Sequence, residues 1–143
     1  MNVDTERIND KIDQLHSYLS QLEEDLPETA EEYVRNRTTR RACEKDFELA
    51  CDTLIDICNI IISGFNNGRP RDNRESIQSL VKEDIIPQTL GNRLKDMNGF
   101  RNLLIHRYGK IDHEQAFVHL ESETGDFQEF IEHIDSFLEE IGE

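Results

Sequence analysis

The chain has few cysteines and prolines and no tryptophan. Its 143 residues include three cysteines and three prolines. An odd number of cysteines argues against a disulfide framework. The spacing of Cys43, Cys51 and Cys58 matches no common zinc-binding pattern. We therefore expect these three residues to be small, buried hydrophobic side chains.

Long apolar runs are also missing. No stretch of 18 apolar residues occurs, so we expect no transmembrane helix and no membrane partner. The opening stretch MNVDTERINDKID is charged throughout, unlike the apolar core of a signal peptide. The length suits one folded unit with a real hydrophobic core. We expect a single cytoplasmic domain spanning residues 1–143.

Positive charge is scarce and unevenly placed. The formal net charge is −15, from 16 basic and 31 acidic residues. Residues 1–34 carry a net −8, residues 35–110 a net +4, and residues 111–143 a net −11 with no Lys or Arg. The overall charge discourages nucleic-acid binding, because polyanions repel one another. Only the central segment leaves a nucleic-acid function open.

A run of arginines begins that central segment. The stretch RNRTTRR contains Arg35, Arg37, Arg40 and Arg41 near the expected start of a helix. A solvated basic turn and a phosphate-contacting edge explain it about equally well.

The apolar periodicity predicts helices. Between Ile8 and Leu26 apolar residues recur at steps of three and four, with Asp4 or Thr5 as a cap and Pro27 at the end. A second helix is expected from Thr38 to Ile62, with Gly64 as its C-cap. Its polar side should expose Glu44, Lys45, Glu48 and Asp52.

The second half continues the helical pattern. A loop is expected over residues 66–73, followed by a short helix that buries Ile77 and Leu80. Pro87 suits the first turn of the next helix, which should run to Gly109, and the tail should break near Gly125. No segment alternates as a strand would. The fold class is therefore an all-α, antiparallel bundle of five to six helices.

Four polar residues interrupt the apolar pattern near the end of the expected helix from Pro87 to Gly109. Asn102 and His106 are four residues apart, so they share one helix face, while Arg101 lies about 140° around from His106. Arg101 and Tyr108 nearly align if the helix persists that far. Arg101 and His106 can therefore serve one site only in a cleft that wraps the helix edge, or with a second subunit.

These residue types suit cleavage of a phosphodiester by its own 2′-hydroxyl. A histidine, with an ordinary pKa near 6.5, can exchange protons near neutrality. An arginine offers a planar, permanently charged fork to phosphate oxygens. Asn102 could hydrogen-bond His106 and fix its orientation. This scheme requires no metal and no cofactor, and we expect none of the other histidines to be catalytic: His16, His113, His119 and His133.

The stretch GFRNLLIHRYG, residues 99–109, resembles the signature of the HepT-like ribonuclease toxins of the HEPN superfamily. That signature is Arg, four residues, His, one residue, Tyr, often with Asn directly after the Arg. The preceding IIPQTLGNRLKDMNGF and the earlier RRACEKDFELACDTLIDICNIII resemble the same family. Arg107 departs from the family pattern, which often has a different residue there.

The resemblance implies a HEPN-like helical bundle that pairs as a homodimer. It further implies metal-independent RNA cleavage, toxic to the host cell, by Arg101 and His106. The implied partner is an antitoxin encoded alongside, a small nucleotidyltransferase of the MntA type that transfers AMP to Tyr108.

Two other classes of function stay open. The bundle could be a catalytically inactive module that binds a nucleotidyltransferase partner or a nucleotide. The strong acidity would also suit a structural dimerisation module or a nucleic-acid mimic.

Overall fold

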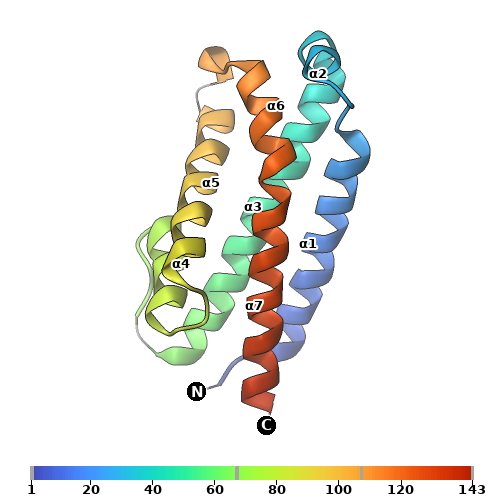
Figure 1. Ribbon diagram of the computed structural model, residues 1–143. Helices are drawn as coiled ribbons and strands as arrows, with labels where there is room; N and C mark the ends of the chain where they lie inside the picture. Colours follow the sequence, from blue (N-terminus) through green and yellow to red (C-terminus); the bar gives the residue numbers. More distant parts are fainter. Residues whose placement is uncertain (1, 67, 107, 143) are drawn as a thin grey trace.

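Four long helices run along the length of the molecule and set its shape (Figure 1). The computed structural model describes residues 2–66, 68–106 and 108–142, apart from the side chain of Tyr108, and no strand occurs in them. The expected all-α bundle is confirmed. The long helices are α1 (Thr5–Asp25), α3 (Arg37–Phe65), α5 (Gln88–His106) and α7 (Thr124–Gly142). The short elements are α2 (Ala30–Arg35), α4 (Asn73–Lys82), α6 (His113–Ser122) and the 3-10 turn η1 (Tyr108–Lys110).

The first helix follows its sequence pattern closely. Asp4 caps α1 by accepting a hydrogen bond from the backbone N–H of Arg7 at 3.2 Å. The helix ends at Asp25, two residues before Pro27. Its buried stripe packs along α3 and consists of Ile8, Ile12, Leu15, Leu19 and Leu22.

The short helix α2 was not predicted, because its six residues are too few to show a helical period. Thr29 caps it through the backbone N–H of Glu32, and Tyr33 is fully buried. The Tyr33 hydroxyl donates a hydrogen bond to Glu44 at 3.4 Å. The expectation that Glu44 is exposed is therefore wrong, because α2 covers that side of α3.

The third helix runs further than its pattern predicted. Gly64 is not the C-cap; the helix continues to Phe65, and Asn66 forms the cap with a left-handed φ of 64°. A Cβ on Gly64 would lie 2.9 Å from the carbonyl oxygen of Asn2. Glycine at this position therefore reflects a close crossing of the N-terminal segment rather than a helix end.

The remaining helices close the core around α3. Gly91 lets α5 approach α4, since a Cβ there would lie 2.7 Å from Cγ2 of Val81. The predicted break near Gly125 is a short interruption between α6 and α7, and both chain ends lie at the end of the bundle opposite η1 (Figure 1). The three cysteines are buried, as predicted. Among the described residues, no helix is long and apolar enough to cross a membrane.

Candidate functional site

The candidate motif occupies the last turns of α5. Leu104 points into the core and anchors this end of the helix, together with Phe100, whose ring lies 5.3 Å from that of Phe47 on α3. Arg101 is directed along the α3 side, whereas Asn102 and His106 are exposed. The apolar residues thus fix the helix end, and the polar residues emerge at its edge.

Arg101 is held by an acidic residue that sequence reasoning did not assign to the site. Its Nε and Nη2 atoms donate hydrogen bonds to Oδ1 of Asp52 on α3, at 3.1 and 2.8 Å. The Arg101 side chain is 19% exposed and that of Asp52 is 43% exposed. A guanidinium has five N–H donors. The ion pair therefore fixes the Arg101 side chain near the surface without using all of its donors.

Asn102 contacts Arg101 rather than His106. The Oδ1 atom of Asn102 accepts a hydrogen bond from Nη1 of Arg101 at 3.1 Å. No side-chain hydrogen bond reaches His106 from any residue that the structure describes. A charged donor makes the stronger hydrogen bond, which favours the arginine over the imidazole. Asn102 thus helps to fix the guanidinium and leaves His106 exposed.

The helix ends earlier than the sequence predicted. The last α-helical residue is His106, and Tyr108 begins the 3-10 turn η1. The expected helix end at Gly109 is therefore wrong, and Arg101 and Tyr108 do not share one continuous α-helix. The chain turns here because Asp112 caps α6 directly afterwards, accepting hydrogen bonds from the backbone N–H groups of Glu114 and Gln115. The Tyr108 side chain and Arg107 lie outside the described residues.

The other chemically active side chains serve the core. Burial raises the pKa of the Cys43 thiol to about 12, and burial raises the pKa values of Cys51 and Cys58 as well. In the described part of the chain, no three His, Cys, Asp or Glu side chains gather as a metal site would require. The buried cysteines therefore add no reactive group to the motif.

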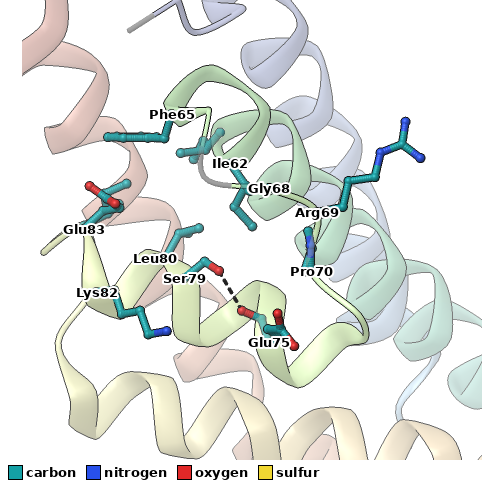
Figure 2. Close-up of a pocket in the computed structure, with 12 residues that line it drawn as sticks. Ile62, Phe65, Gly68, Arg69, Pro70, Glu75, Ser79, Leu80, Lys82 and Glu83 are labelled. Atoms are coloured by element: carbon teal, nitrogen blue, oxygen red, sulfur yellow. Dashed lines mark hydrogen bonds between the residues drawn. The ribbon is translucent and has the colours of Figure 1, made fainter.

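A cavity of about 290 Å³ lies at the other end of the bundle, between the end of α3 and α4. Figure 2 shows Leu80 and Ile62 along its wall and the Arg69 side chain pointing away from it. The hydroxyl of Ser79 donates to the backbone oxygen of Glu75, so this polar group is already used within α4. Arg101, Asn102 and His106, the motif side chains that the structure describes, do not line this cavity.

Comparison with known proteins identifies the family to which most of the chain matches. The family model for "Ribonuclease HepT-like" matches residues 8–134. A "tRNA nuclease HepT" from Aphanizomenon flos-aquae is 24% identical over 137 residues, which cover 96% of this chain and 93% of the relative. An "mRNA nuclease HepT" from Shewanella oneidensis is 30% identical over 87 residues, which cover 61% of this chain and 65% of the relative.

Solved structures show the same fold. A tri-AMPylated Shewanella oneidensis HEPN toxin in complex with MNT antitoxin superposes with a TM-score of 0.84 at 24% identity, covering 90% of this chain and 96% of that one. A toxin–antitoxin structure with AMP-PNP superposes with a TM-score of 0.83 at 25% identity, covering 90% and 97%. The resemblance noted in the motif therefore extends to nearly the whole chain. The protein belongs to the HepT-like ribonuclease family, and its class is that of an endoribonuclease.

Proposed function

We propose that this protein is the toxin of a toxin–antitoxin pair and that it cleaves RNA without a metal ion through Arg101 and His106. The observation that carries the proposal is the anchored guanidinium of Arg101. It is fixed by Asp52 and Asn102, keeps N–H donors to spare, and lies on the same helix end as an exposed imidazole. Membership of a ribonuclease family supports this assignment.

The chemistry divides between the two side chains. The 2′-oxygen attacks the adjacent phosphorus and the bond to the 5′-oxygen breaks, which leaves a cyclic phosphate and a free 5′-hydroxyl. An imidazole accepts the proton of the 2′-hydroxyl and an imidazolium returns a proton to the leaving 5′-oxygen. The Arg101 fork stabilises the negative charge that builds on the phosphate oxygens, and Asn102 supports that fork.

A homodimer would complete the site. Arg101 and His106 are about 140° apart around one helix, and no hydrogen bond joins them within the described chain. Two large apolar side chains beside the motif, Leu103 and Ile105, are 36% and 37% exposed. A Cβ on Gly99, on the same helix, would meet nothing within 4 Å. Leu103 and Ile105 are about 160° apart around α5, so the exposed apolar positions flank the motif on two sides. A second copy that covers this helix end would bury them and place two motifs in one groove.

The antitoxin would inactivate the ribonuclease by modifying Tyr108. The partner is a nucleotidyltransferase antitoxin, as in the toxin–antitoxin complex with MNT to which this fold is similar. The Tyr108 phenol oxygen forms a bond to the α-phosphorus of ATP, pyrophosphate leaves, and the phenol proton passes to solvent. Tyr108 is only two residues from His106, so each AMP adds bulk and negative charge where RNA phosphate must bind. Both proteins and the RNA would meet in the cytoplasm.

The nuclease assignment is tested by cleavage in EDTA. Purified protein is expected to cut RNA in EDTA, and His106→Ala is expected to lose that activity. His16→Ala, an exposed histidine on α1, is the matched control and should cut as the wild type does. Equal cleavage by His106→Ala and wild type would remove His106 from the mechanism.

Modification is tested by intact mass after co-expression with the neighbouring nucleotidyltransferase. The wild type is expected to gain the mass of one or more AMP groups, and Tyr108→Phe to gain none. Tyr18→Phe, on α1, serves as the control and should still be modified.

A second candidate is a catalytically inactive module that binds the nucleotidyltransferase or a nucleotide. The ion pair to Asp52, which partly neutralises Arg101, is the observation that favours it. Such a protein would bind its partner, leave RNA intact in EDTA and leave bacterial growth unaffected.

A further inference from the structure

The short helix α4 lies against both of the helices that carry the Arg101 ion pair. It packs on α3 and on α5, and Gly91 lets α5 come close to Val81 of α4. The first turn of α4 contacts Asn98, which precedes Arg101 on α5 by about one helical turn. The start of α4 therefore lies about one turn from the place where α5 meets Asp52 of α3.

Two side-chain hydrogen bonds join the first turn of α4 to its two neighbours. The Nδ2 atom of Asn73 donates to Oδ1 of Asn98 on α5 at 3.1 Å. The hydroxyl of Ser76 donates to Oδ1 of Asn59 on α3 at 2.7 Å, and it lies farther, at 3.3 Å, from the backbone oxygen of Asp72 in its own helix. Asn98 is 6% exposed and Ser76 is 2% exposed. Polar side chains thus occupy buried positions at which apolar residues are more common.

These bonds close a ring of contacts around the Arg101 site. On α5, Asn98 and Arg101 are three residues apart, so they lie within about 60° of one another around the helix. On α3, Asp52 and Asn59 are seven residues apart, which places them within about 20°. Each pair therefore faces the same way from its helix. We call this ring the α3–α4–α5 frame, and its members are Asp52, Asn59, Asn73, Ser76, Asn98 and Arg101.

Directional hydrogen bonds fix the register of two helices more strictly than apolar contacts do. Phe47 and Phe100 also join α3 to α5 here, with ring centroids 5.3 Å apart. An apolar contact of this kind is non-directional, so it tolerates a small slide or rotation. A buried carboxamide does not, because a shift of α5 would leave Asn98 without its partner at a cost in free energy. The frame therefore ties the height and rotation of α5 to α4, and through α4 to α3.

We propose that Asn98 is a positioning residue for RNA cleavage, which holds α5 in the register that brings Arg101 to Asp52. It does so through its hydrogen bond to Asn73. The proposal deepens the proposed ribonuclease function and rests on it for the effect on catalysis. Loss of this bond would leave α5 folded and packed while its motif end shifts. A displacement of about 1 Å is enough to slow a reaction strongly, even when the substituted residue lies away from the reacting atoms.

The first test replaces Asn98 with leucine, which has a similar volume and forms helix well. The apolar side chain keeps the packing, and the half-buried Asn73 can turn its amide toward water, so Tm should stay close to that of wild type. We expect kcat for RNA cleavage to fall about tenfold and KM to change less than about twofold.

Thr53→Val is the matched control for Asn98→Leu, because it also replaces a buried polar side chain with an apolar one. The Thr53 hydroxyl donates to the backbone oxygen of Leu49 within α3, so its loss breaks no bond between helices. This variant should cut RNA as the wild type does. A wild-type kcat in folded Asn98→Leu would overturn the proposal.

A double variant distinguishes positioning from a general loss of structure. Asp52→Asn weakens the ion pair that the register serves. In that background Asn98→Leu is expected to lower kcat by less than about twofold, because both substitutions act through the place of Arg101. If the two losses multiply instead, Asn98 acts elsewhere and the proposal is wrong.

Asn73→Ala breaks the same hydrogen bond from the α4 side and serves if Asn98→Leu does not fold. Asn73 is half-buried, and Asp72 already caps the helix that it begins. The expected loss in kcat is again about tenfold. Asn92→Ala is the control, since Asn92 is exposed and accepts a hydrogen bond from Gln88 on its own helix. Equal activity of these two alanine variants would contradict a role for the Asn73 bond.

The register can also be measured without cleavage, which separates this proposal from the proposed function. The Nε–H group of Arg101 donates to Asp52 at 3.1 Å, so its exchange with water should be slowed. Its NMR signal, assigned by its loss in Arg101→Lys, should exchange at least about fivefold faster in Asn98→Leu than in wild type and Thr53→Val. An unchanged rate would show that Asn98 does not place Arg101. If the wild type cuts no RNA, the ribonuclease assignment fails, and this exchange rate still decides the positioning role.

Discussion

At the scale of single residues, Asp52 is the side chain with the clearest untested role. It receives two hydrogen bonds from Arg101 and lies on a different helix. We expect Asp52→Asn to reduce kcat for RNA cleavage by about 10- to 100-fold, because misplacing a catalytic side chain by about 1 Å can cost that much. KM should change less than kcat.

Asp56→Asn is the matched control for Asp52→Asn. Asp56 lies one helical turn further along α3 and also forms an ion pair, at 3.2 Å to Lys11. Loss of that pair should leave cleavage unchanged. If the two variants lose activity equally, Asp52 acts through helix stability and not through Arg101.

Sequence reasoning found the motif residues but not their contacts. Arg101, Asn102, His106 and Tyr108 stand out because they are polar within an apolar helix pattern. Asp52 could not be found, because its contact with Arg101 spans 49 positions and depends on the register between α3 and α5. The same limit explains why Asn102 was matched to His106: spacing along one helix shows which residues can meet and not which hydrogen bond is stronger.

At the scale of helices, long apolar periods were reliable and short segments were not. The buried apolar rows of α1 and α3 could be predicted because their periodicity repeats over many helical turns. The six residues of α2 show no period, so its burial of Glu44 could not be foreseen. Gly64 looks like a helix end in the sequence, but in the structure it marks a close crossing by Asn2. A glycine in a sequence does not show whether the chain turns or another segment passes nearby.

Two carboxyl groups, one buried and one half-buried, should give helix packing a pH dependence. Burial, with a hydrogen bond and repulsion from Asp25, raises the pKa of Asp46 to about 7. Burial, with repulsion from Asp126 and Asp96, raises the pKa of Glu123 to about 7. The unfolded chain ionises these groups near pH 4. Between about pH 4 and 7 the folded chain therefore holds more protons, and these two groups lower the free energy of unfolding as the pH rises.

We expect Asp46→Asn and Glu123→Gln to become more stable relative to wild type as the pH is raised from 5 to 8. The amide side chains have no charge to bury, so they escape the penalty that ionisation imposes on the wild type. Thermal melts across this range measure the difference in Tm. Asp135→Asn, an exposed position on α7, should give a constant difference. If the Tm difference between Asp46→Asn and wild type stays constant from pH 5 to 8, this carboxyl does not titrate in that range.

At the scale of the whole molecule, pairing through α5 is the feature that activity should require. Leu103→Ser together with Ile105→Ser should convert a dimer, at twice 16.7 kDa, into a monomer and abolish RNA cleavage. Both side chains are already about one-third exposed, so the monomer fold should persist. Light scattering after size-exclusion chromatography gives the mass.

Val118→Ser is the control for this pair of substitutions, since Val118 is a large apolar residue that is 54% exposed on α6 and not on α5. It should leave both mass and cleavage unchanged. A wild type that is monomeric at concentrations where it cuts RNA would contradict the need for pairing.

The anchoring of Arg101 has one more consequence, for the cost of holding substrate. A free arginine side chain loses about 2 kcal/mol of rotational freedom when it is immobilised. Asp52 and Asn102 immobilise this guanidinium when the chain folds, long before any RNA arrives. The entropic cost of ordering this side chain therefore falls on folding and not on RNA binding, because the guanidinium is already oriented when RNA binds.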